Sequence, residues 1–172
     1  NEDFIKEKDL KIGDRVLIQK AGDVIPEVVE AVKSKRTGEE KEFIMPKVCP
    51  VCGAPTIRED GEAVTRCTGI ECSAKALRNI VHFASKEGMD IDGLGIKIIE
   101  QLVDKGLIKN IADIYTLTVE DVASLKKNGK KFAQNLIDSI NASKENDLYR
   151  LITALGIRHV GVKAAKILAK QY

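Results

Sequence analysis

The most informative part of the sequence is CPVCG at residues 49–53, which is followed by CTGIEC at residues 67–72. These two segments hold all the cysteines of the 172-residue chain. The pairs enclose two and four residues and lie fourteen residues apart, close to the spacing of structural four-thiolate zinc sites. A short loop brings two sulfurs to one ion at about 2.3 Å, and glycine after the second cysteine permits a tight turn. We therefore expect one structural zinc ion, with no open position for water, bound by Cys49, Cys52, Cys67 and Cys72.

Other uses of the cysteines are less consistent with the rest of the sequence. Two disulfides would need an oxidising compartment, whereas a lysine-rich chain without a signal-peptide pattern favours the cytosol. A redox dithiol at residues 49–52 would leave Cys67 and Cys72 unexplained. His82 follows the cluster, but four thiolates already complete a tetrahedron, so we expect it on a helix over residues 74–85.

Composition limits the possible partners. Hydrophobic residues make up 44% of the chain, enough for a core, and the absence of Trp predicts that this core is mostly aliphatic. No apolar run approaches the roughly 20 residues of a membrane span, so we expect no membrane partner. The net charge is only +2, so nucleic-acid binding would depend on local groups. The chain begins at Asn1 without Met and ends in a helical pattern at Tyr172, which suggests a piece of a longer protein.

The first part, residues 1–46, has the pattern of β-strands. Residues 15–20 and 28–33 are rich in β-branched side chains with a period near two. The intervening AGDVIP at residues 21–26 predicts a turn, with Pro26 ending the strand pairing. So few strands cannot close a sheet, which predicts the C-terminal part of a small barrel. By itself, a lysine such as Lys20 would only make a soluble strand edge.

The second and third parts differ in how they are stabilised. Residues 47–74 form a module too small to fold without metal, with a short strand expected at residues 64–66. From residue 75 to 172 the pattern is helical, and GLG at residues 93–95 precedes an apolar helix. Related arrangements return around residues 122–136 and 151–165, which predicts stacked units that resemble helix-hairpin-helix motifs.

The hairpins have a chemistry of their own. Glycines let the backbone approach a ligand, and the next helix offers unpaired N–H groups and a positive dipole end to an anion such as a DNA phosphate. Lysines occupy the first turn after each hairpin, where the dipole alone would favour Asp or Glu: Lys97, Lys130, Lys131 and Lys163. One such lysine is usually only solvated, and one Gly-x-Gly usually only caps a helix. Three related hairpins in series, behind a zinc module, favour phosphate binding.

Three stretches carry a resemblance to a known family: KAGDVIP at residues 20–26, CPVCG at 49–53 and MDIDGLG at 89–95. With the serial hairpins they make the whole chain similar to the C-terminal half of bacterial NAD-dependent DNA ligase. The implied fold is multidomain α+β: the end of an OB-fold barrel (residues 1–46), a four-cysteine zinc finger (47–74) and a truncated all-α helix-hairpin-helix domain (75–172).

The resemblance also implies where DNA binds. Lys20 would contact a phosphate, while Val24 and Ile25 would lie against the minor groove. The hairpins would grip phosphates through their glycines and lysines, namely Gly93, Gly95, Lys97, Gly129, Lys130, Lys131, Gly156, Gly161 and Lys163.

The activity implied for the full-length enzyme is nick sealing in duplex DNA during replication and repair. It would take AMP from NAD onto a lysine, pass it to the 5′-phosphate at a nick, and let the 3′-hydroxyl attack with Mg²⁺. We expect it to act as a monomer in the bacterial cytoplasm. The family's lysine lies in a Lys-x-Asp-Gly motif, which this chain lacks, because residues 58–61 begin with Arg58 and a guanidinium stays protonated. We therefore expect no catalytic residue here, and a role in gripping DNA.

Two alternatives stay open at the sequence level. One is a DNA-repair or recombination protein with helix-hairpin-helix motifs and no ligase activity, although the barrel motif before the zinc module argues against it. The other is a non-catalytic scaffold in which zinc and glycines only hold the fold. Binding to a nicked duplex would separate the scaffold from the ligase interpretation.

Overall fold

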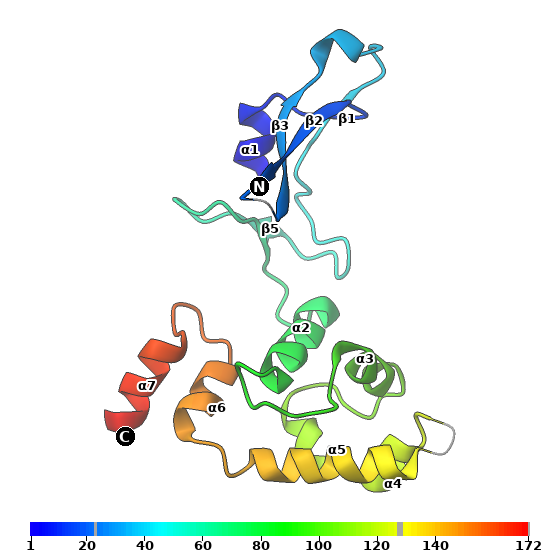
Figure 1. Ribbon diagram of the computed structural model, residues 1–172, viewed down its shortest axis with the longest axis vertical. Coiled ribbons are helices and arrows are strands. Elements are labelled where there is room, and N and C mark those ends of the chain that lie inside the picture. The colour runs from blue at the N-terminus through cyan, green and yellow to red at the C-terminus, as the bar shows by residue number, and fades with distance from the viewer. Residues whose placement is uncertain (23, 127–128, 172) are drawn as a thin grey trace. The chain divides into compact units, whose positions relative to one another are not determined.

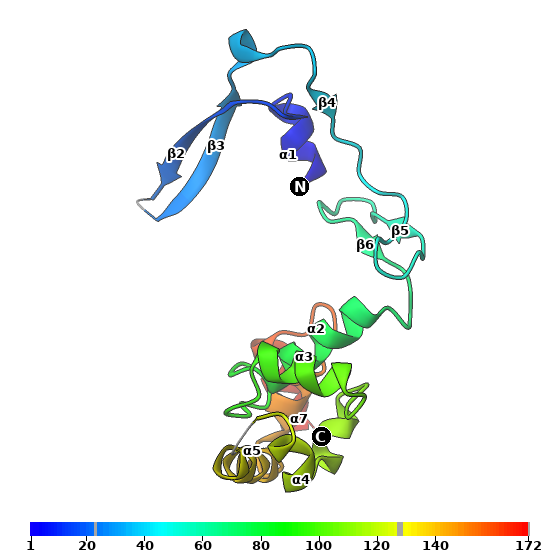
Figure 2. The same cartoon turned by 90° about the vertical axis from the view of Figure 1, so that its right-hand side faces the viewer.

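The computed structural model describes residues 1–22, 24–126 and 129–171, which form two compact units, Asn1–Ile70 and Glu71–Tyr172 (Figures 1 and 2). Among the described residues, none of the helices combines the length and apolar character needed to cross a bilayer. The first unit carries small sheets, and the second is built of helices, as the predicted α+β architecture requires.

The first unit has one α-helix, a 3₁₀ turn and three antiparallel strand pairs, β1–β4, β2–β3 and β5–β6. No closed barrel is formed by its described residues, as expected for part of an OB fold. The elements are α1 (Glu2–Glu7), β1 (Lys11–Ile12), β2 (Val16–Ala21), β3 (Ile25–Ala31), η1 (Lys33–Lys35), β4 (Lys41–Glu42), β5 (Thr56–Ile57) and β6 (Arg66–Cys67).

Several details of this unit correct the sequence interpretation. The sequence pattern of residues 1–46 predicted only strands and turns and did not predict helix α1. Pro26 does not end the pairing, because it lies inside β3 opposite Lys20 in a ladder whose register shifts once, between Leu17 and Ile18. Among the described residues β3 pairs with β2 alone, so it is an edge strand, where a proline that lacks a backbone N–H is tolerated. The strand expected at residues 64–66 begins only at Arg66.

An ion-pair network ties the start of this unit to the loop after β3. Arg36 Nε donates to Asp14 Oδ1 at 2.7 Å, and the Asp14 side chain is only 2% exposed. The guanidinium holds the pKa of Asp14 at about 2. Asp9 accepts from both Lys33 at 2.9 Å and Arg36 at 3.1 Å. These bonds hold Asp9, which precedes β1, and Asp14, in the turn between β1 and β2, against residues 33–36.

The second unit is helical throughout its regular structure. Its helices are α2 (Ser73–Ala84), α3 (Ile96–Asp104), η2 (Ala112–Thr116), α4 (Val119–Ala123), α5 (Lys130–Ser143), α6 (Leu148–Ala154) and α7 (Val162–Gln171). The helix predicted over residues 74–85 corresponds to α2. Neighbouring helices pack in pairs, α2 with α3, α4 with α5, and α6 with α7, while α2 also contacts α6.

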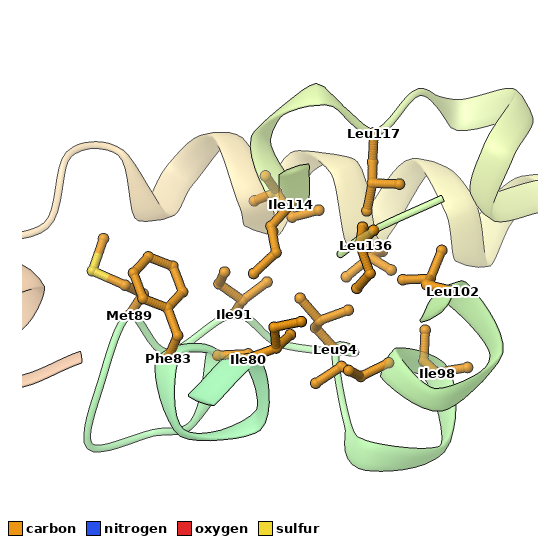
Figure 3. Packing of buried hydrophobic residues seen from close by; sticks show 14 of the residues in the cluster. Ile80, Phe83, Met89, Ile91, Leu94, Ile98, Leu102, Ile114, Leu117 and Leu136 are labelled. Carbon is orange, nitrogen blue, oxygen red and sulfur yellow. The ribbon is translucent and has the colours of Figure 1, made fainter. Parts of the chain in front are cut away.

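The core of this unit is aliphatic, as its composition predicted. Helices α2, α3 and α5, together with the segments between them, supply most of its side chains (Figure 3), and α6 adds Ala154. Phe83 is the buried aromatic residue of the cluster, and its ring meets Tyr115 edge-on with centroids 6.1 Å apart. The largest side chains of this core that are less than 2% exposed are Ile80, Ile99, Leu102, Ile108, Ile114, Val122 and Leu136.

His82 has a structural partner. Its Nε2 lies 3.1 Å from the carbonyl oxygen of Thr153, so it joins α2 to α6. This agrees with the prediction that His82 lies on a helix.

Candidate zinc centre and hairpin helix starts

The four cysteines converge as their spacing predicted. The sulfurs of Cys49, Cys52, Cys67 and Cys72 all lie within 4.8 Å of one another. Sulfurs bound to one tetrahedral zinc at about 2.3 Å would lie about 3.8 Å apart. Cys52 Sγ and Cys67 Sγ are 3.4 Å apart, far beyond the roughly 2.05 Å of a disulfide. The donor set therefore fits a structural zinc ion and does not fit the disulfide alternative.

Local backbone structure shapes the first knuckle. Gly53 adopts φ +72°, and its N–H donates to the Cys49 carbonyl oxygen at 2.9 Å. The predicted need for glycine after the second cysteine is thus met by a left-handed turn. Hydrogen bonds from the backbone N–H groups of Cys52 and Val51 lower the pKa of the Cys49 thiol to about 6. Such an environment favours the thiolate, the form that binds zinc.

Gly69 is a second glycine of the site, and the sequence interpretation missed its role. A Cβ on Gly69 would lie 2.9 Å from Cys52 Sγ and 3.3 Å from Cys67 Sγ. Only glycine lets the second knuckle pass this close to both sulfurs. The signal was present in the sequence, since Gly69 lies between Cys67 and Cys72, but glycine spacing alone does not say which sulfur it faces.

Three helices begin directly after a predicted hairpin, and their lysines lie where expected. Lys97 is the second residue of α3, Lys130 and Lys131 open α5, and Lys163 is the second residue of α7. All four lysines are exposed, and the first turns of the three helices hold no acidic residue. In the part of the chain that the structure describes, no side chain caps α3 or α5. Their first N–H groups therefore remain available to an external anion.

The hairpin glycines fall into three structural kinds. Gly93 and Gly156 have φ of +80° and +63°, so the turn itself requires glycine. Gly129 is buried, and a Cβ there would lie 2.9 Å from the Lys126 carbonyl oxygen. Gly95 and Gly161 are different, because neither has positive φ and a Cβ would meet nothing within 4 Å. Nothing in the described fold requires glycine at these two positions.

The tip of the β2–β3 hairpin gathers the predicted residues of the first unit. Lys20 is exposed, Val24 is 80% exposed and Ile25 is 67% exposed. Ile25 opens β3 opposite Ala21, so the three side chains belong to one end of the hairpin. Asp23 of this turn, like Asn128 of the second helical hairpin, lies outside the described residues.

Comparisons with protein families agree with this arrangement. The NAD-dependent DNA ligase OB-fold domain matches residues 1–40, and the NAD-dependent DNA ligase C4 zinc finger domain matches residues 48–74. A SAM-like helix-hairpin-helix tandem matches residues 85–142, and a helix-hairpin-helix motif matches residues 150–172. The match to the C4 zinc finger and the convergence of four sulfurs identify the metal as structural zinc.

The chain is also similar to curated proteins named DNA ligase. Those of Thermoanaerobacter sp. (strain X514) and Acetivibrio thermocellus are each 56% identical to it, and that of Clostridioides difficile (strain 630) is 54% identical. The similarity covers 100% of this chain but 26% of each relative, so the chain spans about a quarter of their length. The chain therefore belongs to the NAD-dependent DNA ligase family, in which it corresponds to the region of the OB fold, the C4 zinc finger and the helix-hairpin-helix motifs.

Proposed function

We propose that this chain is the DNA-gripping region of an NAD-dependent DNA ligase, which seals nicks with 5′-phosphate and 3′-hydroxyl ends in duplex DNA. Its three parts would be residues 1–46, 47–74 and 75–172. The helical part would hold backbone phosphates without sequence preference, because backbone amides read charge and not bases. The enzyme would act as a monomer on nicked DNA in the bacterial cytoplasm during replication and repair.

The observation that carries this proposal is the open space at Gly95 and Gly161. Both glycines directly precede a helix with a lysine at its second position and no acid in its first turn. Since the described fold would accommodate a Cβ at either place, we infer that glycine serves close approach by something outside the chain. Unpaired N–H groups, the positive helix end and a lysine together suit a phosphate.

The hairpin tip in the first unit would add a second kind of contact. Val24 and Ile25 have large aliphatic side chains that are exposed to solvent at the end of the β2–β3 pair. Exposed aliphatics beside a lysine suit a DNA groove, where apolar side chains meet sugars and base edges while the lysine meets a phosphate. Lys20, Val24 and Ile25 would thus contact the minor-groove side of the duplex.

Zinc would serve the fold and leave the reaction to other parts of the enzyme. Four thiolates complete its coordination, so no position is left for water or substrate. NAD, Mg²⁺ and the adenylated lysine would belong to the remaining three quarters of the enzyme's length. Incubation of this chain with NAD should leave its mass unchanged, and an AMP adduct on any of its lysines would contradict this division of labour.

Salt dependence of binding tests the proposed grip. Each phosphate neutralised contributes about 0.9 to the slope of log affinity against log salt, so Lys131→Ala should lower the slope by about one. Lys144→Ala, at the other end of α5, is the matched control and should leave the slope unchanged. Fluorescence anisotropy of a labelled nicked duplex across salt concentrations measures both. Binding that is indifferent to salt would favour the scaffold alternative.

A further inference from the structure

A hydrogen bond joins the first hairpin, around residues 93–95, to α5, the helix that follows the second hairpin. The backbone N–H of Asp92 donates to Ser139 Oγ at 2.8 Å, although the two residues lie 47 positions apart. Ser139 is half-buried near the middle of α5, the helix that begins after Gly129. Asp92 directly precedes the GLG turn of residues 93–95 that leads into α3.

The same face of α5 packs against that turn. A Cβ at Gly93 would lie 3.7 Å from Leu136 Cδ1 and 3.8 Å from Phe132 Cε2, so the turn rests on these side chains. Leu94 and Leu136 are both buried in the shared core (Figure 3). The ammonium of Lys126, which lies just before Gly129 in the second hairpin, lies over the Phe132 ring at 4.0 Å from its centroid. One helix face therefore contacts both hairpins.

The hydrogen bond leaves the anion-binding groups of the turn unblocked. Gly93 N–H is already used by the Asp92 carboxylate at 3.0 Å, and the N–H groups of Ile98 and Ile99 donate to the Gly95 carbonyl oxygen. The N–H groups of Ile96 and Lys97 remain at the helix start. Packing against Leu136 fixes the depth of the turn, whereas the bond to Ser139 is directional and fixes how its backbone is rotated.

We propose that Ser139 is a positioning residue for DNA binding: its hydroxyl holds the Asp92 amide and thereby aims the Gly95 helix start at the phosphate. This inference rests on the proposed function, because it assigns Ser139 a part in the same grip. Ser139 itself does not touch DNA. Removing its hydroxyl lets the turn rotate while the exposed Asp92 amide is solvated, so stability changes little and affinity falls about fivefold.

The first test observes the bond itself. In Ser139→Ala the Asp92 amide should exchange with solvent faster by hydrogen-exchange NMR, while Ser139→Thr keeps a hydroxyl and should retain slow exchange. An exchange rate at Asp92 that is the same in wild type and Ser139→Ala would overturn the proposal. Asn141→Ala is the matched control, since Asn141 is exposed on α5 and accepts only the local bond from Lys144 at 2.8 Å.

The second test is a pair of double-mutant cycles on binding of a labelled nicked duplex. Ser139→Ala should weaken binding about fivefold in the wild-type and Gly161→Val backgrounds, but have no effect in Gly95→Val, where the first hairpin is already disengaged. Ser139→Thr and Asn141→Ala should bind as wild type does. A Ser139→Ala loss of the same size in both glycine backgrounds, or no loss in any, would overturn the proposal.

These outcomes separate the inference from the proposed function. If Gly95→Val and Gly161→Val themselves bind like the wild type, the proposed grip fails, and the role of Ser139 fails with it. If the glycine variants bind poorly and the Ser139 cycles are additive, the grip stands and only the inference is wrong.

Discussion

Helices α4 and α3 begin in opposite ways. Thr118 caps α4, where its hydroxyl accepts from the Asp121 N–H at 3.2 Å and the Asp121 carboxylate accepts from the Thr118 N–H at 2.9 Å. Helix α3 begins directly after Gly95, which offers no side-chain cap, and it carries Lys97 in its first turn. The chain thus completes the start of one helix by itself and leaves the start of the other open.

The other helices extend this contrast. Asn1 caps α1, which has Glu2 and Asp3 in its first turn. Cys72, a zinc ligand, precedes α2, and Asp147 precedes α6. Among the α-helices that the structure describes, only those that follow a hairpin, α3, α5 and α7, begin with a glycine next to a lysine-bearing first turn. We infer from this contrast that the anion suited to these three helix starts belongs to a partner, which we propose is DNA.

The largest expected effect is at the zinc ligands that precede α2. Cys67→Ser should prevent the segment of residues 47–72 from folding, because the apparent metal-binding energy of such sites, about 10 kcal/mol or more, is folding energy. Metal analysis should find one zinc per wild-type chain and none in the variant. Circular dichroism should still report the α3–α7 helices, whose core is aliphatic. A variant that keeps zinc would break this account of the site.

Charge reversal at the open starts of α3 and α7 should have the second-largest effect. Lys97→Glu with Lys163→Glu gives α3 and α7 the acid that α1 and α4 already have, so helix stability should hold or rise slightly. Affinity for nicked duplex should fall about a hundredfold, since two phosphate contacts become repulsive. Thermal melts and anisotropy measure the two quantities. A parallel fall of both would mean that the lysines serve the fold.

The smallest effect on DNA binding should come from a helix start that the chain completes itself. Thr118→Ala removes one half of the capping box of α4 and should cost about 1 kcal/mol of the free energy of unfolding. Affinity for DNA should stay at the wild-type value. Denaturant unfolding and the same anisotropy titration measure the two quantities. Weaker DNA binding by folded Thr118→Ala would contradict the distinction between the capped start of α4 and the open start of α3.

Local signals account for what the sequence predicted. Cysteine spacing indicated the zinc ligands, because few arrangements bring four sulfurs to one ion. Glycines just before a helical pattern, as in Gly-x-Gly at residues 93–95, indicated the hairpins. The start of α1 also carried a signal, Asn1 followed by two acids, but six residues gave too short a pattern against the neighbouring strands. The pairing of Pro26 depends on β3 having a single partner, which no local pattern reports.

The roles of individual residues needed the folded chain. Gly95 and Gly129 both directly precede a helix in the sequence. In the fold, however, a Cβ added at Gly95 would enter open space, whereas a Cβ added at Gly129 would collide with the Lys126 carbonyl oxygen. The bond from Asp92 to Ser139 spans 47 positions, and the contact of Gly69 with two sulfurs depends on the closed knuckles. Such distinctions come from tertiary packing and are invisible to periodicity and spacing.

The most direct test of the central claim compares glycines of these two kinds. Gly95→Val and Gly161→Val should keep wild-type helix content, because a side chain there enters open space, and should bind nicked duplex at least tenfold more weakly, with a smaller salt slope. Gly129→Val should lose stability as well as binding, since it must displace backbone. Anisotropy and circular dichroism on the three variants decide the matter: folded Gly95 and Gly161 variants that bind like the wild type would contradict the account.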